Sequence, residues 1–420
     1  MQTNMQTRLL IKNIKTLVQV READCLKVNG TDMKELPCID NAWMAIDNGV
    51  IADYGLMEDF PGIEDWKGLE IIDASGKLIL PCYADSHTHI VYAGNREGEF
   101  VDRINGLSYE EIFRRGGGIL NSASRLKDAS EQELFEQAMV RLKEVIAQGT
   151  GSIEIKSGYG LSVESELKML RVIKRIKDLN LIPVKATFLG AHALPLEYKN
   201  DKQGYINLIV NEMLPAIASE KLADYIDVFC EQNYFTAQET EYILNAGKKH
   251  GLIPKVHAEQ LSHFGGIQAG IACGAISVDH LEFCNDTDIE LLKQCDTMPT
   301  VLPGAAFFLS LPLPPARKMI DAGLAVAFAS DFNPGSSPSG NMNFMMSLGC
   351  VQYKLTPEEV INACTINSAY AMNLSHEVGS ITIGKKANFF ITQPISSYAF
   401  IPYSFGSNLI ESVYLNGMKQ

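Results

Sequence analysis

Two histidines one residue apart follow an apolar stretch near residue 80. The segment LPCYADSHTH (residues 80–89) places Asp85, His87 and His89 at alternating positions. Alternate residues of a β-strand face the same side of a sheet, so both imidazoles should point the same way. Imidazole is a common ligand of zinc, iron and nickel. The spacing therefore favours a metal site, although two incidental histidines on a surface strand would give the same pattern.

Other polar residues stand at the ends of strand-like runs further along the chain. These residues are His192, His257, His280 and Asp331. A single histidine in such a place is usually a hydrogen-bonded core residue, but residues that end the parallel strands of a barrel meet at one mouth. Histidines and a carboxylate can hold a metal and leave one position for water, whose pKa falls to about 7. With Asp331 to carry the proton, this set has the composition of a hydrolase site.

The elements that must position these residues alternate in type between residues 78 and 375. Eight runs rich in β-forming residues, from KLILPCYADSHTH to LAVAFASD, are separated by amphipathic stretches. In SEQELFEQAMVRLKEVIAQG (residues 130–149), for example, apolar residues recur at helical spacing and a glycine precedes the next run. This alternation predicts an α/β fold, a TIM-type (β/α)8 barrel over residues 78–375.

The two ends of the chain share a different pattern. The first ~75 residues alternate short β-type runs with turn signals such as Asn48-Gly49, and residues 379–393 and 408–418 have the same texture. The simplest interpretation is one composite, β-sandwich-like domain. It would be built from residues 1–77 and 376–420 and would lie beside the barrel.

Composition limits the partners. The formal charge of −14 argues against nucleic acid or an anionic membrane surface. No apolar run approaches the ~18 residues of a membrane span, and the first residues lack the features of a secretory signal. The cysteines, nine in number and without a CxxC pair, predict free thiols in a reducing cytoplasm. We expect a cytoplasmic enzyme with a small-molecule substrate, and a homodimer because such symmetry is common.

The motifs resemble those of the amidohydrolase superfamily and, within it, the imidazolonepropionase family, which opens an imidazolone ring in histidine breakdown. The HxH pattern, the histidines that end the fifth and sixth runs and the aspartate that ends the eighth are shared widely in the superfamily. The segments KSGYG (residues 156–160) and SDFNPG (residues 330–335) are more specific to the family. The matching stretches span residues ~80 to 340.

The resemblance implies a ligand set and a substrate. It implies one divalent or trivalent metal ion per chain, zinc or iron, with four ligands: His87, His89, His257 and Asp331. It implies catalytic roles near the metal-bound water for three residues: Asp331, His280 and Gln260. It implies substrate contacts from seven residues: Arg96, Tyr159, His192, Gln260, Asn333, Gly335 and Ser336. The substrate would be 4-imidazolone-5-propanoate and the product N-formimidoyl-L-glutamate, with Arg96 offering a planar pair of donors to the propionate.

Three positions depart from the family pattern. Gln260 stands where some relatives have glutamate, so no carboxylate is available there and Asp331 or His280 must move the proton. Ser336 replaces a frequent threonine and keeps the hydroxyl. Cys82 replaces a frequent glycine without an evident consequence.

Two further residues invite a role near the metal. Asp85 could orient an imidazole or could pair only with the backbone, and the sequence leaves both open. Lys156 invites comparison with the carbamylated lysine that bridges two metals in binuclear amidohydrolases. It stands on the second strand-like run, which is the wrong strand for that role, so we expect one metal.

Two alternatives remain for the function. Another mononuclear amidohydrolase, such as a deaminase of an aromatic or purine-like amine, would keep the same ligands but would not need the Arg96 fork. A non-catalytic scaffold related to these enzymes would have lost its ligands. All four ligand positions are filled here, which disfavours the scaffold.

Overall fold

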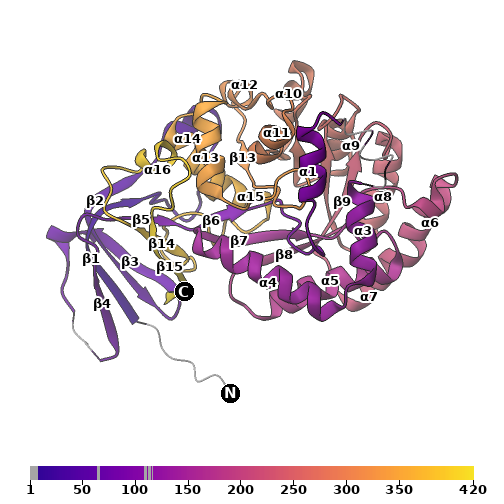
Figure 1. Cartoon of the computed structure of the whole chain (residues 1–420). Helices are drawn as coiled ribbons and strands as arrows, with labels where there is room; N and C mark the ends of the chain where they lie inside the picture. Colours follow the sequence, from indigo (N-terminus) through magenta and orange to yellow (C-terminus); the bar gives the residue numbers. More distant parts are fainter. Residues whose placement is uncertain (1–7, 64–66, 108–110, 112–114, 116) are drawn as a thin grey trace.

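The computed structural model describes residues 8–63, 67–107, 111, 115 and 117–420. Figure 1 shows two parts side by side: a ring of strands surrounded by helices, and a separate sheet that carries both ends of the chain. None of the helices within these ranges is long and apolar enough to span a membrane.

The barrel is built from parallel strands that neighbour one another in chain order. In the described residues there are eight: β6 (Tyr83–Asp85), β7 (Thr150–Lys156), β8 (Val184–Ala191), β9 (Tyr225–Cys230), β10 (Ile253–Ala258), β11 (Ser277–His280), β12 (Met298–Val301) and β13 (Ala327–Phe328). The ring closes just beyond the first and last strands, where Thr88 forms a parallel bridge with Phe332. The predicted (β/α)8 barrel is confirmed.

Helices cover the outside of the barrel, and four of them begin with a capping box. The ones that follow the strands are α1 (Glu97–Ile104), α3 (Ile119–Asp128), α4 (Glu131–Ala147), α5 (Val163–Asp178), α6 (Lys202–Leu208), α7 (Leu214–Glu220), α8 (Ala237–Lys249), α9 (Gly266–Cys273), α10 (Asp286–Leu292), α11 (Pro303–Leu309), α12 (Ala316–Asp321), α13 (Met342–Val351), α14 (Pro357–Asn362) and α15 (Ser368–Ala371). Ser130, Thr236, Asn285 and Thr356 each form a capping box at a helix start. Each such cap stabilises its helix by about 1 kcal/mol.

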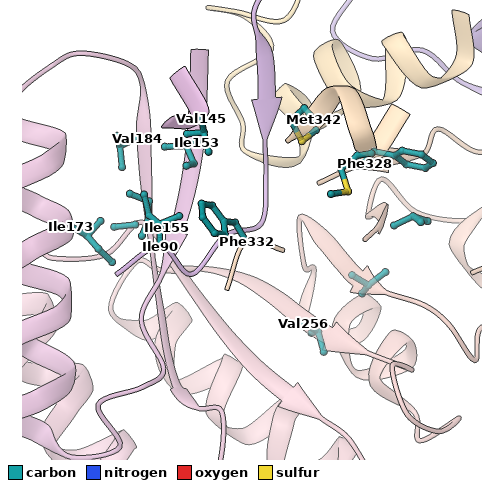
Figure 2. Close-up of a cluster of buried hydrophobic side chains, with 14 of the residues drawn as sticks. Ile90, Val145, Ile153, Ile155, Ile173, Val184, Val256, Phe328, Phe332 and Met342 are labelled. Carbon is teal, nitrogen blue, oxygen red and sulfur yellow. The ribbon is translucent and has the colours of Figure 1, made fainter. Parts of the chain in front are cut away.

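The alternation along β7 separates an apolar layer from a charged one. Figure 2 shows Ile153 and Ile155 of β7 in the cluster that also holds Val145 of α4 and Ile173 of α5. Successive strand residues face opposite sides, so Glu154 and Lys156 face the inside of the barrel. The apolar side chains of β7 pack against the surrounding helices, and its charged side chains lie inside the barrel.

The second sheet joins the two ends of the chain. Its strand order is β16-β15-β14-β5-β1-β2-β3, with β4 beside β1. The strands are β1 (Arg8–Val18), β2 (Cys38–Asp47), β3 (Val50–Leu56), β4 (Leu69–Asp73), β5 (Leu78–Pro81), β14 (Phe389–Thr392), β15 (Ile410–Leu415) and β16 (Met418–Lys419), and the short helix α16 (Phe400–Tyr403) lies between β14 and β15. It has its own core, in which the rings of Phe389 and Tyr414 stack 4.8 Å apart. The predicted second β-domain made from both termini is confirmed.

The first barrel strand begins later than the predicted start at residue 78. Leu78–Pro81 pairs with β1 and β14 of the terminal sheet, and the barrel strand starts at Tyr83. Every residue from Leu78 to Asp85 is buried, because this stretch passes directly from one core to the other. Hydrophobicity alone therefore does not mark the crossing.

Candidate active site

His87 and His89 lie just beyond β6, on a segment held from both sides. Asp331 N donates to His87 O at 3.0 Å, and His89 N donates to Phe332 O at 2.9 Å. The Thr88 hydroxyl donates to Glu154 O at 2.6 Å on the other side. This pairing fixes the backbone and brings the two Nε2 atoms to 3.3 Å from each other.

The other predicted ligands meet the same point. Asp331 Oδ1 lies 3.5 Å from His87 Nε2 and 3.6 Å from His89 Nε2, and the ring of His257 lies 4.5 Å from that of His87. The ring of His280 follows at 5.3 Å from His257. One potential ligand atom from each residue lies within 4.8 Å of the others in two groups: His87 with His89 and Asp331, and His87 with His257 and His280. All of these residues are at most 2% exposed.

Two carboxylates lie on the far side of His87 and His257 from the centre of the site and orient the two rings. Asp279 Oδ2 lies 2.6 Å from His87 Nδ1, and Asp227 Oδ2 lies 2.9 Å from His257 Nδ1. A carboxylate only accepts, so Nδ1 of His87 carries the hydrogen and its Nε2 presents a lone pair to the centre, and the carboxylate beside Nδ1 of His257 favours the same tautomer there. Burial, with the positive charge of Lys156 and the neighbouring imidazoles, holds the pKa of His87 far below its usual value. The neutral, Nε2-facing form is the one that binds metal.

The residues at this point fit a metal ion. Nε2 of His87 lies 3.3 Å from Nε2 of His89. Because Nδ1 of His87 carries the hydrogen, its Nε2 has a lone pair, and a cation between the two nitrogens would stabilise this close approach. Nitrogen and carboxylate oxygen are the donors that zinc and iron take. Sequence reasoning missed Asp227 and Asp279. The signal for Asp227 was an acidic residue inside the otherwise apolar strand YIDVFC, which is costly unless it is paired. Asp279 stands in the short, half-polar strand SVDH and gave no such signal.

A cluster of buried ions lies beneath the histidines. We call it the buried ion cluster: Glu154, Lys156, Asp227, Lys255 and Asp279, all fully buried. Lys156 Nζ lies 2.6 Å from Glu154 and 2.7 Å from Asp227, and Lys255 contacts the other oxygen of Glu154. Although burial alone would lower it, Asp227 and Glu154 raise the pKa of Lys156 above its usual value. An amine that stays protonated does not form a carbamate.

Asp85 pairs with both the backbone and the side chain of Ser330, which is neither of the two roles considered from the sequence. Its carboxylate accepts from Ser330 N at 2.9 Å and from the Ser330 hydroxyl at 2.5 Å. It therefore ties the end of β6 to the segment after β13. The residue helps to close the barrel next to the site.

A cavity of about 480 Å³ opens over the histidines. Every residue singled out from the sequence for substrate contact lines it: Arg96, Tyr159, His192, Gln260, Asn333, Gly335 and Ser336. His89, His257, His280 and Asp331 also border the cavity, whereas His87 is not among its lining residues. The segments that end the strands thus bring three of the four predicted ligands and all the predicted substrate contacts to the lining of one cavity.

One wall of the cavity carries two guanidinium groups. Arg96 lies against Gly335, where a Cβ would stand 1.2 Å from its Nη2. Arg103 donates to Gly335 O at 3.4 Å and lies over the ring of Phe308. Arg96 precedes α1 and Arg103 lies seven residues later, two helical turns along the same face. The sequence analysis did not single out Arg103, and this spacing was the signal.

The loop after β13 is held by Asn333. Its side-chain oxygen accepts from the N–H groups of Gly335 and Ser336, each at 2.8 Å. Its side-chain nitrogen donates to Asp331 O at 2.7 Å and to the Ser336 hydroxyl at 2.6 Å. The Ser336 hydroxyl donates in turn to Asp331 Oδ2 at 3.1 Å. Asn333 and Ser336 therefore orient Asp331 as well as lining the cavity.

His192, Gln260 and His280 lie around the remaining walls. The ring of His192 stacks on that of His89 at 5.4 Å, and burial lowers the pKa of His192 to about 3. Gln260 follows β10, and Glu231 holds the next residue by accepting from Leu261 N at 2.8 Å. Although burial alone would lower it, the Glu282 carboxylate 3.6 Å away raises the pKa of His280.

Comparisons with known proteins identify relatives of this chain. The amidohydrolase family model matches residues 78–418. The imidazolonepropionase of Christiangramia forsetii is 59% identical, covering 97% of this chain and 99% of the relative. That of Flavobacterium johnsoniae is 60% identical over 97% of this chain and 98% of its own.

More distant solved structures share the fold. A triazine hydrolase variant has a TM-score of 0.73 at 14% identity, covering 98% of this chain and 94% of its own. A guanine deaminase from C. acetobutylicum with bound guanine has a TM-score of 0.69 at 14% identity, covering 98% and 99%. The fold, the site and the near-complete match to the closer relatives lead to one conclusion: this chain belongs to the amidohydrolase family and, within it, to the imidazolonepropionases.

Proposed function

We propose that this enzyme hydrolyses the cyclic amide of 4-imidazolone-5-propanoate to N-formimidoyl-L-glutamate, a step of histidine degradation. The observation that carries the proposal is the arrangement of charged and metal-binding side chains around the cavity. A buried group of histidines and one aspartate lies at its base, and arginine lies on one wall. A small cyclic amide with a carboxylate arm is complementary to both ends, and the relatives at 58–60% identity are named for this reaction.

We assign the metal to His87, His89, His257 and Asp331, as one ion, zinc or iron. When bound, the ion would supply Lewis acidity and lower the pKa of water at the site. The protonated, ion-paired Lys156 supports a single ion, because the bridge of a binuclear site needs a lysine carbamate. Carboxylates outnumber lysines by one in the buried ion cluster, and this excess negative charge favours a cation directly above it.

The chain's own residues supply orientation and proton transfer. Arg96 pairs with the propionate, while Tyr159 and His192 hold the ring against the base of the cavity. Water adds to the ring carbonyl carbon, and Asp331 takes a proton from that water. The carbon–nitrogen bond of the ring then breaks, and Asp331 passes the proton to the leaving nitrogen. His280 donates a hydrogen bond to the oxygen on which negative charge develops.

Gln260 changes the options for proton transfer. Its amide can donate and accept hydrogen bonds but does not take up a proton at neutral pH. We therefore place Gln260 as an orienting contact to substrate and water, and Asp331 as the proton carrier.

The test is turnover of imidazolone propionate by the metal-loaded enzyme. The ultraviolet absorbance of the substrate should fall as N-formimidoyl-L-glutamate appears. Treatment with a chelator should abolish the change, and added zinc or iron should restore it. Deamination of a purine with no turnover of the imidazolone would instead establish the deaminase alternative.

We further propose that the enzyme works as a cytoplasmic homodimer. The free thiols support a reducing compartment, and two-fold assembly is the commonest form of oligomer. Light scattering on the purified protein should give twice the mass of one chain; the mass of one chain would contradict the dimer.

A further inference from the structure

The loop that carries Tyr159 is held by a buried carboxylate. Glu166, in the first turn and a half of α5, is fully buried. One of its oxygens accepts from Gly160 N at 2.6 Å and from Leu161 N at 3.1 Å. The other accepts from Gly158 N at 3.2 Å. Glu166 therefore sets the course of the loop of residues 157–161.

The same loop determines the hydrogen positions of His192. His192 Nδ1 lies 3.0 Å from Gly158 O. A carbonyl oxygen only accepts, so Nδ1 carries the hydrogen, and in the neutral ring Nε2 carries none. His192 lines the cavity, so Nε2 is the ring nitrogen left free to accept from a donor on a bound molecule.

The glycines of the loop leave this arrangement little freedom. Gly158 has a φ of +112°, and a Cβ there would stand 2.8 Å from His192 Nδ1. At Gly160 a Cβ would stand 2.4 Å from the backbone nitrogen of Glu166. The close approach of loop, glutamate and histidine depends on the absence of both side chains.

We propose that Glu166 is a positioning residue that acts through the Gly158 carbonyl to make His192 a fixed acceptor for a ring N–H of the substrate. The inference rests on the proposed function, because an imidazolone offers such an N–H and an N-methylated ring does not. It extends that function by naming the atom of the substrate that His192 recognises and the residue that keeps His192 ready to accept it.

Glu166→Gln tests the proposal with a change of nearly equal size. The glutamine oxygen can still accept from Gly160 and Leu161, but its NH2 group faces the Gly158 N–H, donor to donor. The variant should fold and hold the same amount of metal as wild type. Loss of one well-aligned hydrogen bond corresponds to roughly 5- to 10-fold, which we expect as a rise in KM with little change in kcat.

A double-mutant cycle separates positioning from general damage. His192→Phe keeps an aromatic ring but removes both nitrogens. If Glu166 acts through His192, adding Glu166→Gln to His192→Phe should change KM by less than about twofold. Independent, multiplicative effects would overturn the proposal. Glu359→Gln is the matched control: this buried carboxylate accepts from Thr356 N at 2.7 Å away from the cavity, so its KM should match wild type.

A spectroscopic test does not depend on the substrate. In protein with 15N-labelled histidine, the resonances that vanish in His192→Phe should show a hydrogen on Nδ1 and none on Nε2, and Glu166→Gln should mix the two tautomers. An Nε2–H tautomer in wild type would overturn the inference even if imidazolone propionate is turned over. Failure to turn over that substrate, with the tautomer as expected, would count against the proposed function and leave the positioning by Glu166 in place.

Discussion

The carboxylates of Asp227 and Asp279 fix how His257 and His87 meet the centre of the site. Asp279 accepts from His87 Nδ1, so the Nε2 lone pair of His87 faces inward, and Asp227 lies 2.9 Å from His257 Nδ1 and accepts from the backbone N–H of His257. Outer partners of this kind commonly contribute 10- to 100-fold to metal affinity. Two buried lysines offset part of the charge of the carboxylates, so the ligands are oriented by a cluster that is itself shielded from solvent.

Replacing His257 by alanine should remove both the metal and the activity. The change deletes one of the four proposed ligands and leaves the Asp227 carboxylate without the imidazole that lies 2.9 Å from it. Metal analysis of the purified variant should find far less than one ion per chain. His263→Ala is the control, because that side chain is 45% exposed and pairs with Asp288 outside the cavity. Full metal content in His257→Ala would rule out the proposed ligand set.

Arg96→Met should weaken turnover while the metal stays bound. A charge-assisted pair with a carboxylate is worth roughly 1.5–3 kcal/mol, which is about 10- to 150-fold in kcat/KM. An imidazolone without the carboxylate arm is the control, since wild type should turn it over poorly and the variant no worse. Equal losses on both compounds would show that Arg96 supports the structure rather than the substrate.

At the scale of residues, the sequence predicts the site residues at strand ends better than the ion pairs between residues inside strands. His257, His280 and Asp331 each end a run, and their meeting follows from barrel geometry. Asp227 and Lys156 occur within runs that look buried, and their pairing crosses from one strand to another. The partner of a buried charge depends on which strands are neighbours, and that information comes only with the closed barrel.

At the scale of elements, the loop after β13 and the helix α1 share one wall of the cavity. Gly335 in the loop receives the guanidinium of Arg96, and its carbonyl accepts from Arg103 two turns along the helix. The arginine geometry therefore depends on a glycine in a different element. The contact with Arg96 alone requires glycine at position 335, because the guanidinium occupies the space that a Cβ would fill.

Gly335→Ala should reproduce much of the loss seen in Arg96→Met. A Cβ at 1.2 Å from Arg96 Nη2 cannot be accommodated, so the guanidinium must leave its place. We expect a rise in KM for imidazolone propionate with unchanged metal content. Gly98→Ala in α1 is the control, because its Cβ would meet nothing within 4 Å. A Gly335→Ala enzyme with wild-type KM would show that Arg96 does not need this position.

Element boundaries are also where the sequence was least informative. The run from Leu78 onward looks like one strand but serves two sheets, because its first part pairs with β14 from the far end of the chain. A strand's sheet is decided by its neighbours, and one of the two neighbours of Leu78–Pro81 is more than 300 residues away in sequence. The pattern of apolar residues does not show which of the two sheets each part of the run joins.

At the scale of the whole molecule, buried polar side chains tie the terminal sheet and its loops to the barrel. Gln19 donates to Asn362 at 2.8 Å and to Thr365 at 3.0 Å. Asn367 accepts from Val28 N at 2.8 Å and donates to Val28 O and Val326 O, each at 3.0 Å. Val28 precedes β2, and Val326 precedes β13, so Asn367 links the N-terminal region to the last barrel strand.

Asn367→Ala should destabilise the whole chain rather than the active site alone. The change leaves the Val28 N–H and the carbonyls it joins without their partner in a fully buried place. Each unsatisfied buried group costs roughly 1–3 kcal/mol, so the free energy of unfolding should fall by about 2–4 kcal/mol. The melting temperature followed by circular dichroism should drop clearly, while KM measured well below it stays near the wild-type value.

Asn408→Ala removes an exposed asparagine that donates to Ala147 O at 3.5 Å, and its melting temperature should stay close to wild type. If the two variants melted together, the junction between sheet and barrel would owe its stability to the apolar packing around Asn367 and not to its hydrogen bonds.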